Sequence, residues 1–206
     1  KVLMIKTTLL EIITITANSL LAFVVSWYLT LRLASADSRW RCLDHPNARS
    51  LHQHPIPRTG GWAIIAGVFA GLMLRILETG ALPLPTLIFL GCGMIPLALI
   101  SSLDDYRGIA AKWRILVHLW VAVSLPALGL APGNLDLPGF ALTLPTGIAI
   151  PLTVIFTLWM INLYNFMDGM DGLAGGMAVI GFAALAWLGR ADAGFASVSL
   201  TVAAAS

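Results

Sequence analysis

The chain has 206 residues, of which 58% are hydrophobic and only 11% are charged. Soluble globular domains are about 25% charged, so this composition excludes an ordinary soluble domain. It predicts an all-α, polytopic membrane protein, because helices satisfy their own backbone groups within lipid. The net charge of +2 says little by itself.

A transmembrane helix needs roughly 20 mainly apolar residues, and runs of this kind recur along the chain. We expect six complete spans and the start of a seventh near Gly194, all within one membrane-embedded domain over residues 1–206. The complete spans are expected at about 8–31, 61–80, 84–103, 114–131, 146–164 and 175–189. Because the chain stops inside an apolar segment at Ser206, we expect it to be the N-terminal portion of a longer protein, truncated at its C-terminus.

Basic residues collect in alternate loops between these runs, which predicts how the chain crosses the membrane. The longest polar loop, 32–60, carries five arginines and three histidines, whereas the loop 131–145 is rich in Pro and Gly and carries a single charge. Basic loops tend to stay in the cytoplasm. We therefore expect loops 32–60, 104–113 and 164–174 on the cytoplasmic face and the N-terminus outside.

A polar stretch between two apolar runs, residues 159–176, reads WMINLYNFMDGMDGLAGG. Four polar side chains recur at every third position: Asn162, Asn165, Asp168 and Asp171. Adjacent members can touch on a helix, although two glycines within the stretch make a regular helix doubtful. Such groups are costly inside a bilayer, so we interpret them as a functional site. A polar loop between two helices is the alternative.

A pair of adjacent carboxylates, Asp104 and Asp105, stands at the end of an apolar run. Two like charges side by side near hydrocarbon are costly unless a proton or a cation offsets them. Mg²⁺ takes oxygen ligands, typically one or two carboxylates with phosphates and water. With Asp168 and Asp171, four carboxylates would share one membrane face, which favours a divalent-cation site without identifying the metal. A solvated helix end is the alternative for the pair.

The polar loop 44–61 is a candidate phosphate-binding segment. Arg49 and Arg58 can bind phosphate oxygens through two parallel hydrogen bonds, although arginines here also serve to orient the chain. The histidines of this loop, among them His52, are interpreted as hydrogen-bonding residues rather than zinc ligands. The carboxylates at the other candidate sites favour hard cations over zinc.

Two cations, Lys112 and Arg114, follow the carboxylate pair. Each is either a phosphate ligand or a residue that orients the chain by its charge. His118 lies within the fourth expected span, where a histidine is more often satisfied at a helix interface than a ligand. Carboxylates that could bind a divalent metal therefore stand beside basic side chains that could bind phosphate, at a membrane surface. This combination indicates phosphoryl transfer between a soluble and a lipid substrate.

Three ordered motifs carry a resemblance to a known family, over about residues 40–180. They read DHPNARSLH followed by PRTGG, then LDDYRG, then NFMDGMDGLA. In this order they resemble the polyprenyl-phosphate N-acetylhexosamine-1-phosphate transferases of glycosyltransferase family 4. The residues of these motifs are most similar to those of the bacterial branch that primes O-antigen and related glycans.

The resemblance implies a reaction and a cellular location. A UDP-activated N-acetylhexosamine would give its sugar-1-phosphate to undecaprenyl phosphate, with release of UMP and with Mg²⁺, or Mn²⁺, required. This would be the first membrane step of cell-envelope polysaccharide synthesis, at the cytoplasmic face of the bacterial inner membrane. The implied partners are the UDP-sugar, undecaprenyl phosphate and the lipid bilayer, without nucleic acid. A homodimer is left open, and the sugar is not identified.

Carried over position by position, the resemblance implies roles for particular residues. Asp104 and Asp105 match the paired aspartates linked to catalysis and to the acceptor phosphate. Asn165 and Asp168 match the metal and diphosphate side of the pocket, and Asp171 matches the residue that reads the uracil. The other substrate-binding candidates are Asn162, Lys112, Arg49, Arg58 and His52.

The expected mechanism is direct attack by a lipid phosphate oxygen, with Asp104 or Asp105 holding or deprotonating the acceptor. A phosphate monoester has a second pKa of about 6, so much of it is already dianionic at neutral pH. A covalent aspartyl-phosphate route is the rival. Family members are much longer, and their later loops supply a further acidic ligand and a histidine-rich motif. The activity of this chain alone is therefore left open.

Two other classes of membrane protein stand as alternatives. An ion- or proton-coupled transporter would use intramembrane carboxylates as a relay and would show acids in mid-span and internal repeats. The acids here stand at span ends instead. A CDP-alcohol phosphotransferase would carry the pattern DGxxAR, but the chain reads DGLAG from Asp171.

Overall fold

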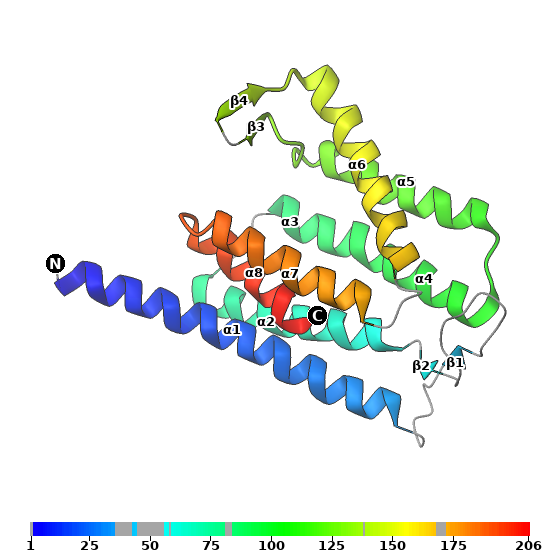
Figure 1. Ribbon diagram of the computed structural model, residues 1–206, viewed down its shortest axis with the longest axis horizontal. Helices are drawn as coiled ribbons and strands as arrows, with labels where there is room; N and C mark the ends of the chain where they lie inside the picture. Colours follow the sequence, from blue (N-terminus) through cyan, green and yellow to red (C-terminus); the bar gives the residue numbers. More distant parts are fainter. Residues whose placement is uncertain are drawn as a thin grey trace. The chain divides into compact units, whose positions relative to one another are not determined.

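The computed structural model describes residues 2–35, 43–44, 56–57, 59–80, 84–137, 139–167 and 172–206. Within these ranges the chain is helical apart from turns and two short antiparallel pairs of strands, as Figure 1 shows. The strands contribute few residues, and the helices are apolar. The prediction of an all-α membrane bundle is therefore confirmed.

Four helical segments in the described part of the chain are long and apolar enough to cross a membrane. They are the Leu9–Ala34 part of α1 (Val2–Ala34), α2 (Gly60–Thr79), the continuous segment Leu84–Arg107 and α6 (Thr146–Met167). Two further apolar helices are shorter, α7 (Leu173–Leu188) and α8 (Ala193–Ala205). The first, second, third and fifth expected spans coincide with the long segments.

The fourth expected span, 114–131, differs from the prediction. Helix α5 (Ala111–Ala127) has 17 residues. At about 1.5 Å per residue it is roughly 25 Å long, less than the ~30 Å thickness of a hydrocarbon core. It begins earlier than expected, and it ends at Ala127, just before the left-handed Gly129 (φ 75°) turns the chain away.

The chain divides into two compact units, and each is described on its own. The first unit comprises residues 1–81 and 168–206; within it α1, α2 and α8 pack together, and α7 packs on α8. Small residues permit this close packing, since a Cβ atom at Gly67 would lie only 2.6 Å from the carbonyl oxygen of Ala22. The hydroxyl of Ser26 on α1 donates to the carbonyl of Ala205 on α8 at 2.6 Å.

The second unit, residues 82–167, is built on one helical segment that changes its winding. Its parts are α3 (Leu84–Phe89), the π-helical turn η1 (Leu90–Met94) and α4 (Ile95–Arg107). Pro96 has no backbone N–H, so the carbonyl of Cys92, four residues earlier, lacks an α-helical donor. The indole Nε1–H of Trp120 on α5 donates to this carbonyl at 2.8 Å and ties α5 to the π-helical turn.

Two short antiparallel pairs of strands occur where the sequence predicts only loops. In the second unit, β3 (Asn134–Leu137) pairs with β4 (Phe140–Thr143), and Gly139 (φ 92°) stands at the turn between them. This hairpin connects α5 to α6. In the first unit, β1 (Leu43–Asp44) pairs with β2 (Ile56–Pro57), and both strands lie within the polar segment 32–60.

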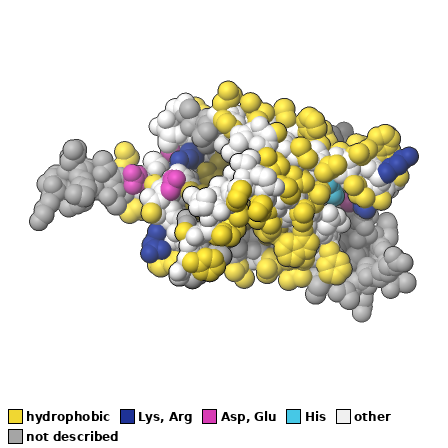
Figure 2. Space-filling model, turned by 90° about the horizontal axis from the view of Figure 1, so that it is seen from above, with side chains coloured by type: hydrophobic (Ala, Val, Ile, Leu, Met, Phe, Trp, Pro, Cys, Tyr) yellow, Lys and Arg dark blue, Asp and Glu magenta, His cyan; other side chains and the backbone are white. Residues whose placement is uncertain are grey.

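Large apolar side chains cover much of the exposed surface. On the face drawn in Figure 2, hydrophobic side chains cover much of the described surface, and few side chains are charged. Phe166, Leu77 and Leu188 are 78%, 76% and 75% exposed. Apolar surface of this extent is unfavourable in water and typical of helices that face lipid.

Candidate functional site

The motif LDDYRG forms the end of α4 and its glycine cap, and the turn that follows into α5 closes on Asp104. Gly108 adopts a left-handed conformation (φ 62°), and its N–H donates to the backbone carbonyl of Asp104 at 2.8 Å. Glycine takes this conformation without a Cβ clash, which makes it the usual residue after a helix end. The N–H of Ile109 then donates to the Oδ1 atom of the Asp104 side chain at 2.8 Å. Asp104 thus fixes the turn through both its backbone and its side chain.

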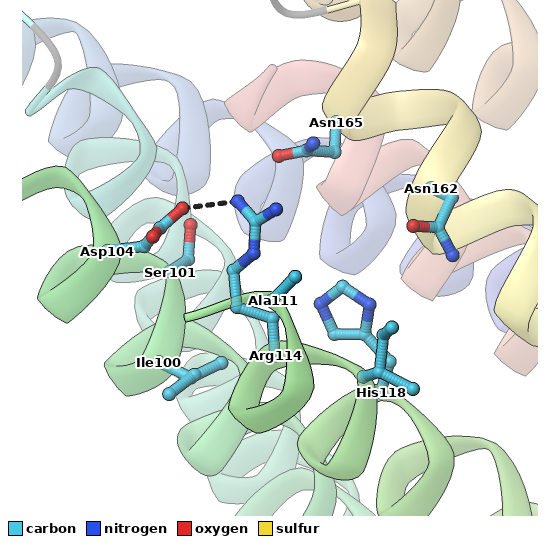
Figure 3. Close-up of a pocket in the computed structure, with 9 residues that line it drawn as sticks. Ile100, Ser101, Asp104, Ala111, Arg114, His118, Asn162 and Asn165 are labelled. Carbon is cyan, nitrogen blue, oxygen red and sulfur yellow. Dashed lines mark hydrogen bonds and ion pairs between the residues drawn. The ribbon is translucent and has the colours of Figure 1, made fainter. Parts of the chain in front are cut away.

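The second oxygen of the same carboxylate binds a cation from α5. The Nη1 atom of Arg114 donates to Oδ2 of Asp104, as the dashed line in Figure 3 shows. The two side chains are 37% and 25% exposed, so this ion pair is partly shielded from solvent. Both oxygens of Asp104 therefore accept hydrogen bonds, and the guanidinium of Arg114 is held in place beside α4.

A cavity of about 140 Å³ opens beside this ion pair, within the second unit. Helices α4, α5 and α6 supply its walls, and Figure 3 shows polar side chains from all three helices. The lining residues are Ile100, Ser101, Asp104, Ala111, Arg114, Ile115, His118, Asn162 and Asn165. The cavity therefore combines one ion pair with an imidazole and two amides.

Two predicted site residues reach this cavity from the last turns of α6. Asn162 and Asn165 lie three residues apart, so they are neighbours on one face of the helix, and both line the cavity. The amide Nδ2 of Asn162 donates to the backbone carbonyl of Leu158 at 2.7 Å, which anchors that side chain. The structure thus brings Asn162 and Asn165 together with Asp104.

Other predicted residues in the second unit lie elsewhere. Asp105 follows Asp104 and is half-buried, but it does not line the cavity. Lys112 is exposed, does not line the cavity and holds its Nζ atom 5.6 Å from the centre of the Trp113 ring. The cation at the cavity is Arg114, whereas the sequence analysis named Lys112 as the substrate-binding candidate. A helical projection of α5 would have separated the two, because residues two apart point to different faces.

The structure corrects the expectation for His118. Sequence reasoning takes this histidine as a satisfied helix-interface residue. In the structure its Nδ1 atom is buried without a hydrogen-bond partner in the described part of the chain, and the ring lines the cavity. His118 stands one turn after Arg114 on the same face of α5.

Five predicted site residues fall outside the described ranges, and their roles stay predictions. They are Arg49, His52, Arg58, Asp168 and Asp171.

The described residues do not by themselves fit a Mg²⁺ site. Both oxygens of Asp104 already accept hydrogen bonds, and Asn165 offers a single amide oxygen. No group of three or more His, Cys, Asp or Glu side chains that could hold a metal occurs within the described ranges. The expected metal ligand Asp168 lies outside them.

Comparison with known proteins gives matches over much of the chain. A family model described as Glycosyl transferase family 4 matches residues 87–206, which is more than half of the chain. This range contains the α4–α5 turn, the cavity and the polar stretch at the end of α6. No solved structure matches the chain significantly.

Similar proteins come from several bacteria. A probable undecaprenyl-phosphate N-acetylglucosaminyl 1-phosphate transferase of Bacillus subtilis is 33% identical over 145 residues, covering 70% of this chain and 39% of that protein. An undecaprenyl-phosphate alpha-N-acetylglucosaminyl 1-phosphate transferase of Yersinia pestis is 33% identical over 148 residues, covering 69% and 38%. A decaprenyl-phosphate N-acetylglucosaminephosphotransferase of Mycolicibacterium smegmatis is 29% identical over 184 residues, covering 83% and 43%. The chain thus spans about two fifths of the length of these relatives.

Proposed function

The chain belongs to glycosyl transferase family 4, and from this premise we propose that the complete protein transfers N-acetylhexosamine-1-phosphate from a UDP-sugar to undecaprenyl phosphate and releases UMP. The relatives described above are named as transferases of N-acetylglucosamine phosphate to undecaprenyl or decaprenyl phosphate. N-acetylglucosamine is therefore the first sugar to test. Because the chain covers only part of those relatives, the activity is proposed for the whole protein.

The observation that carries the proposal is the cavity beside the Asp104–Arg114 ion pair. A guanidinium presents several N–H donors in a planar fork that matches phosphate oxygens. Here the carboxylate of Asp104 holds one edge of that fork, while amides from α6 line the same cavity. A pre-positioned cation with neutral polar neighbours at the end of an apolar helix suits a phosphate group that arrives from a membrane surface.

We propose direct attack rather than a covalent route through Asp104. Both oxygens of that carboxylate are engaged, one by the Ile109 N–H and one by Arg114. We propose that Asp104 positions Arg114, that Arg114 binds a phosphate oxygen, and that a lipid phosphate oxygen is the nucleophile. A phosphate monoester with a second pKa of about 6 is largely dianionic at neutral pH, so a general base is helpful rather than essential.

The location and the cofactor are also part of the proposal. The apolar helices and the basic loops support a place in the bacterial inner membrane with the active site on the cytoplasmic face. Priming of an O-antigen or a related glycan is the role that the sequence motifs favour. Dependence on Mg²⁺ or Mn²⁺ is proposed from the acidic residues of the motifs, with Asn165 and Asp168 as ligands.

The test is an assay of UMP release by the complete protein. The purified protein in detergent or nanodiscs is given UDP-N-acetylglucosamine and undecaprenyl phosphate, and UMP and the lipid-linked sugar are measured together. We expect both products in equal amounts, their loss on treatment with EDTA, and their recovery when Mg²⁺ is added. Omitting undecaprenyl phosphate is the control, and it should abolish UMP release.

Two results would contradict the proposal in different ways. A phosphorylated enzyme trapped with the UDP-sugar alone would replace direct attack with the covalent route. Sodium- or proton-driven flux across vesicles, without UMP release under any condition, would favour the transporter alternative.

A further inference from the structure

His118, which lines the cavity, carries a ring nitrogen without a hydrogen-bond partner among the described residues. The Nδ1 atom of His118 is buried and makes no hydrogen bond to any described residue. Buried polar atoms are almost always hydrogen-bonded, because an unpaired one loses its hydration without compensation. Because the ring lines the cavity, a turn of the imidazole would bring this nitrogen to a molecule bound there.

The neighbours of this imidazole indicate what kind of group that is. Arg114 lies one turn earlier on α5, and Asn162 and Asn165 line the same cavity from α6 (Figure 3). The single carboxylate on the cavity wall, Asp104, already binds Arg114. The guanidinium has only donors, and the amides and the imidazole can each donate as well as accept, so this wall can bind a ligand rich in acceptor oxygens.

The size of the cavity indicates which part of a ligand it can accommodate. A volume of about 140 Å³ is close to that of a cavity of roughly 150 Å³ that accommodates benzene. One phosphate group fits such a space, whereas a nucleoside or a sugar would need more room. The cavity lined by the described residues is therefore large enough for a single phosphate.

We propose that His118 is a substrate-binding residue that donates a hydrogen bond from Nδ1 to a phosphate oxygen also contacted by Arg114. The soft χ2 torsion of histidine lets the ring turn Nδ1 toward the cavity when the phosphate enters. The inference rests on the proposed function, which provides two sources for this phosphate. One is the terminal phosphate of the lipid acceptor, and the other is the diphosphate of the nucleotide sugar.

The test compares three substitutions in the complete protein. His118→Asn keeps an N–H donor near the position of Nδ1, His118→Gln places its amide near the position of Nε2, and His118→Leu removes both nitrogens. UMP release is measured while each substrate is varied in turn. Because a hydrogen bond to a charged group is lost, we expect His118→Leu and His118→Gln to raise one KM about tenfold or more. His118→Asn should stay within about threefold of the wild type.

The two substrates separate the two sources of phosphate. A rise confined to the KM for undecaprenyl phosphate assigns His118 to the acceptor phosphate, and a rise confined to the KM for the UDP-sugar assigns it to the donor diphosphate. Leu116→Ala is the matched control, because Leu116 is exposed on α5 and does not line the cavity. This control should leave both KM values unchanged.

Other results would overturn the inference. The first is a His118→Leu variant with unchanged KM values. The second is an equal rise in KM in the His118→Asn and His118→Gln variants. The third is an effect on kcat alone. If His118→Leu does not give a monodisperse protein on gel filtration, the comparison of Asn with Gln decides. If the wild type releases no UMP, the proposed function fails. Retention of radiolabelled inorganic phosphate by the wild type and by His118→Gln then tests His118 separately.

Discussion

At the scale of single residues, the α4–α5 turn selects one of two neighbouring cations. Lys112 and Arg114 lie two residues apart at the start of α5, so a helix directs them to different faces. Arg114 meets the carboxylate of Asp104, whereas Lys112 stays exposed over the Trp113 ring. The selection depends on where α5 begins, and that point is set by the glycine turn at Gly108.

This arrangement predicts unequal losses of activity on substitution. Arg114→Gln should lower kcat/KM for UMP release by about 10- to 150-fold, the equivalent of one hydrogen bond between charged groups. Arg114→Lys should fall between this variant and the wild type, because an ammonium keeps the charge but lacks the planar fork. Lys112→Gln, with the same loss of charge two residues away, is the control and should stay within about threefold.

Equal effects of Lys112→Gln and Arg114→Gln would contradict the assignment of the phosphate-binding cation. Such a result would mean that the overall positive charge of the turn, rather than one positioned guanidinium, attracts the anionic substrates. Measuring kcat/KM at two ionic strengths separates these cases, because salt screens an exposed charge more strongly than a partly buried pair.

At the scale of helices, the packing of α5 against the long segment Leu84–Arg107 follows from one proline. Pro96 removes the N–H that would bind the carbonyl of Cys92 in an α-helix. The π-helical turn η1 lies just before it, and Trp120 supplies the replacement donor. In surroundings without water, this side-chain donor matters because an unpaired carbonyl there is costly.

Removing this donor should destabilise the second unit. Trp120→Phe keeps an aromatic ring but deletes the indole N–H, and we expect a loss of about 1 kcal/mol in the free energy of unfolding. This corresponds to a fall of about 2–4 °C in the unfolding temperature, measured in detergent by intrinsic fluorescence. Trp113→Phe, on the same helix, is the matched control and should change the unfolding temperature by less.

A second substitution makes this prediction specific to the Cys92 carbonyl. Pro96→Ala restores a backbone N–H that can bind that carbonyl directly, so Trp120→Phe should cost less in this background. A double-mutant cycle measures the coupling between the two positions. Additive effects of the two substitutions would show that Trp120 stabilises the fold by packing alone.

At the scale of the whole molecule, the sequence predicted the long helices well because a membrane imposes their length. The third expected span, 84–103, and the fifth, 146–164, fall within the helical segments Leu84–Arg107 and Thr146–Met167. Apolar runs of about 20 residues carry this information without any tertiary contact. The fourth span was placed less well, because α5 ends before Gly129 within an otherwise apolar run.

Part of the site could be predicted for a similar reason. Asp104, Asn162 and Asn165 are polar residues at the ends of apolar helices, where burial is costly unless the residue has a role, and all three line one cavity. A helical projection puts Lys112 and Arg114 on different faces, but which face of α5 meets the cavity depends on its packing against α4 and α6, and the same holds for His118. The β3–β4 hairpin was also missed, since Pro and Gly are as common in irregular loops as in turns.

Orientation in the membrane is the property of the whole molecule on which the proposed chemistry depends. The α4–α5 turn and the polar stretch before α7 are expected on the cytoplasmic face, and the β3–β4 hairpin outside. Single cysteines test this in a background of Cys42→Ser and Cys92→Ala. We expect Ala110→Cys and Leu173→Cys to react with a membrane-impermeant maleimide only in inverted vesicles, and Ala141→Cys only in intact spheroplasts. If Ala110→Cys and Leu173→Cys react from opposite sides, Asp104 and Asp168 lie on opposite faces of the membrane and cannot serve one reaction. That result would contradict the proposed transferase function.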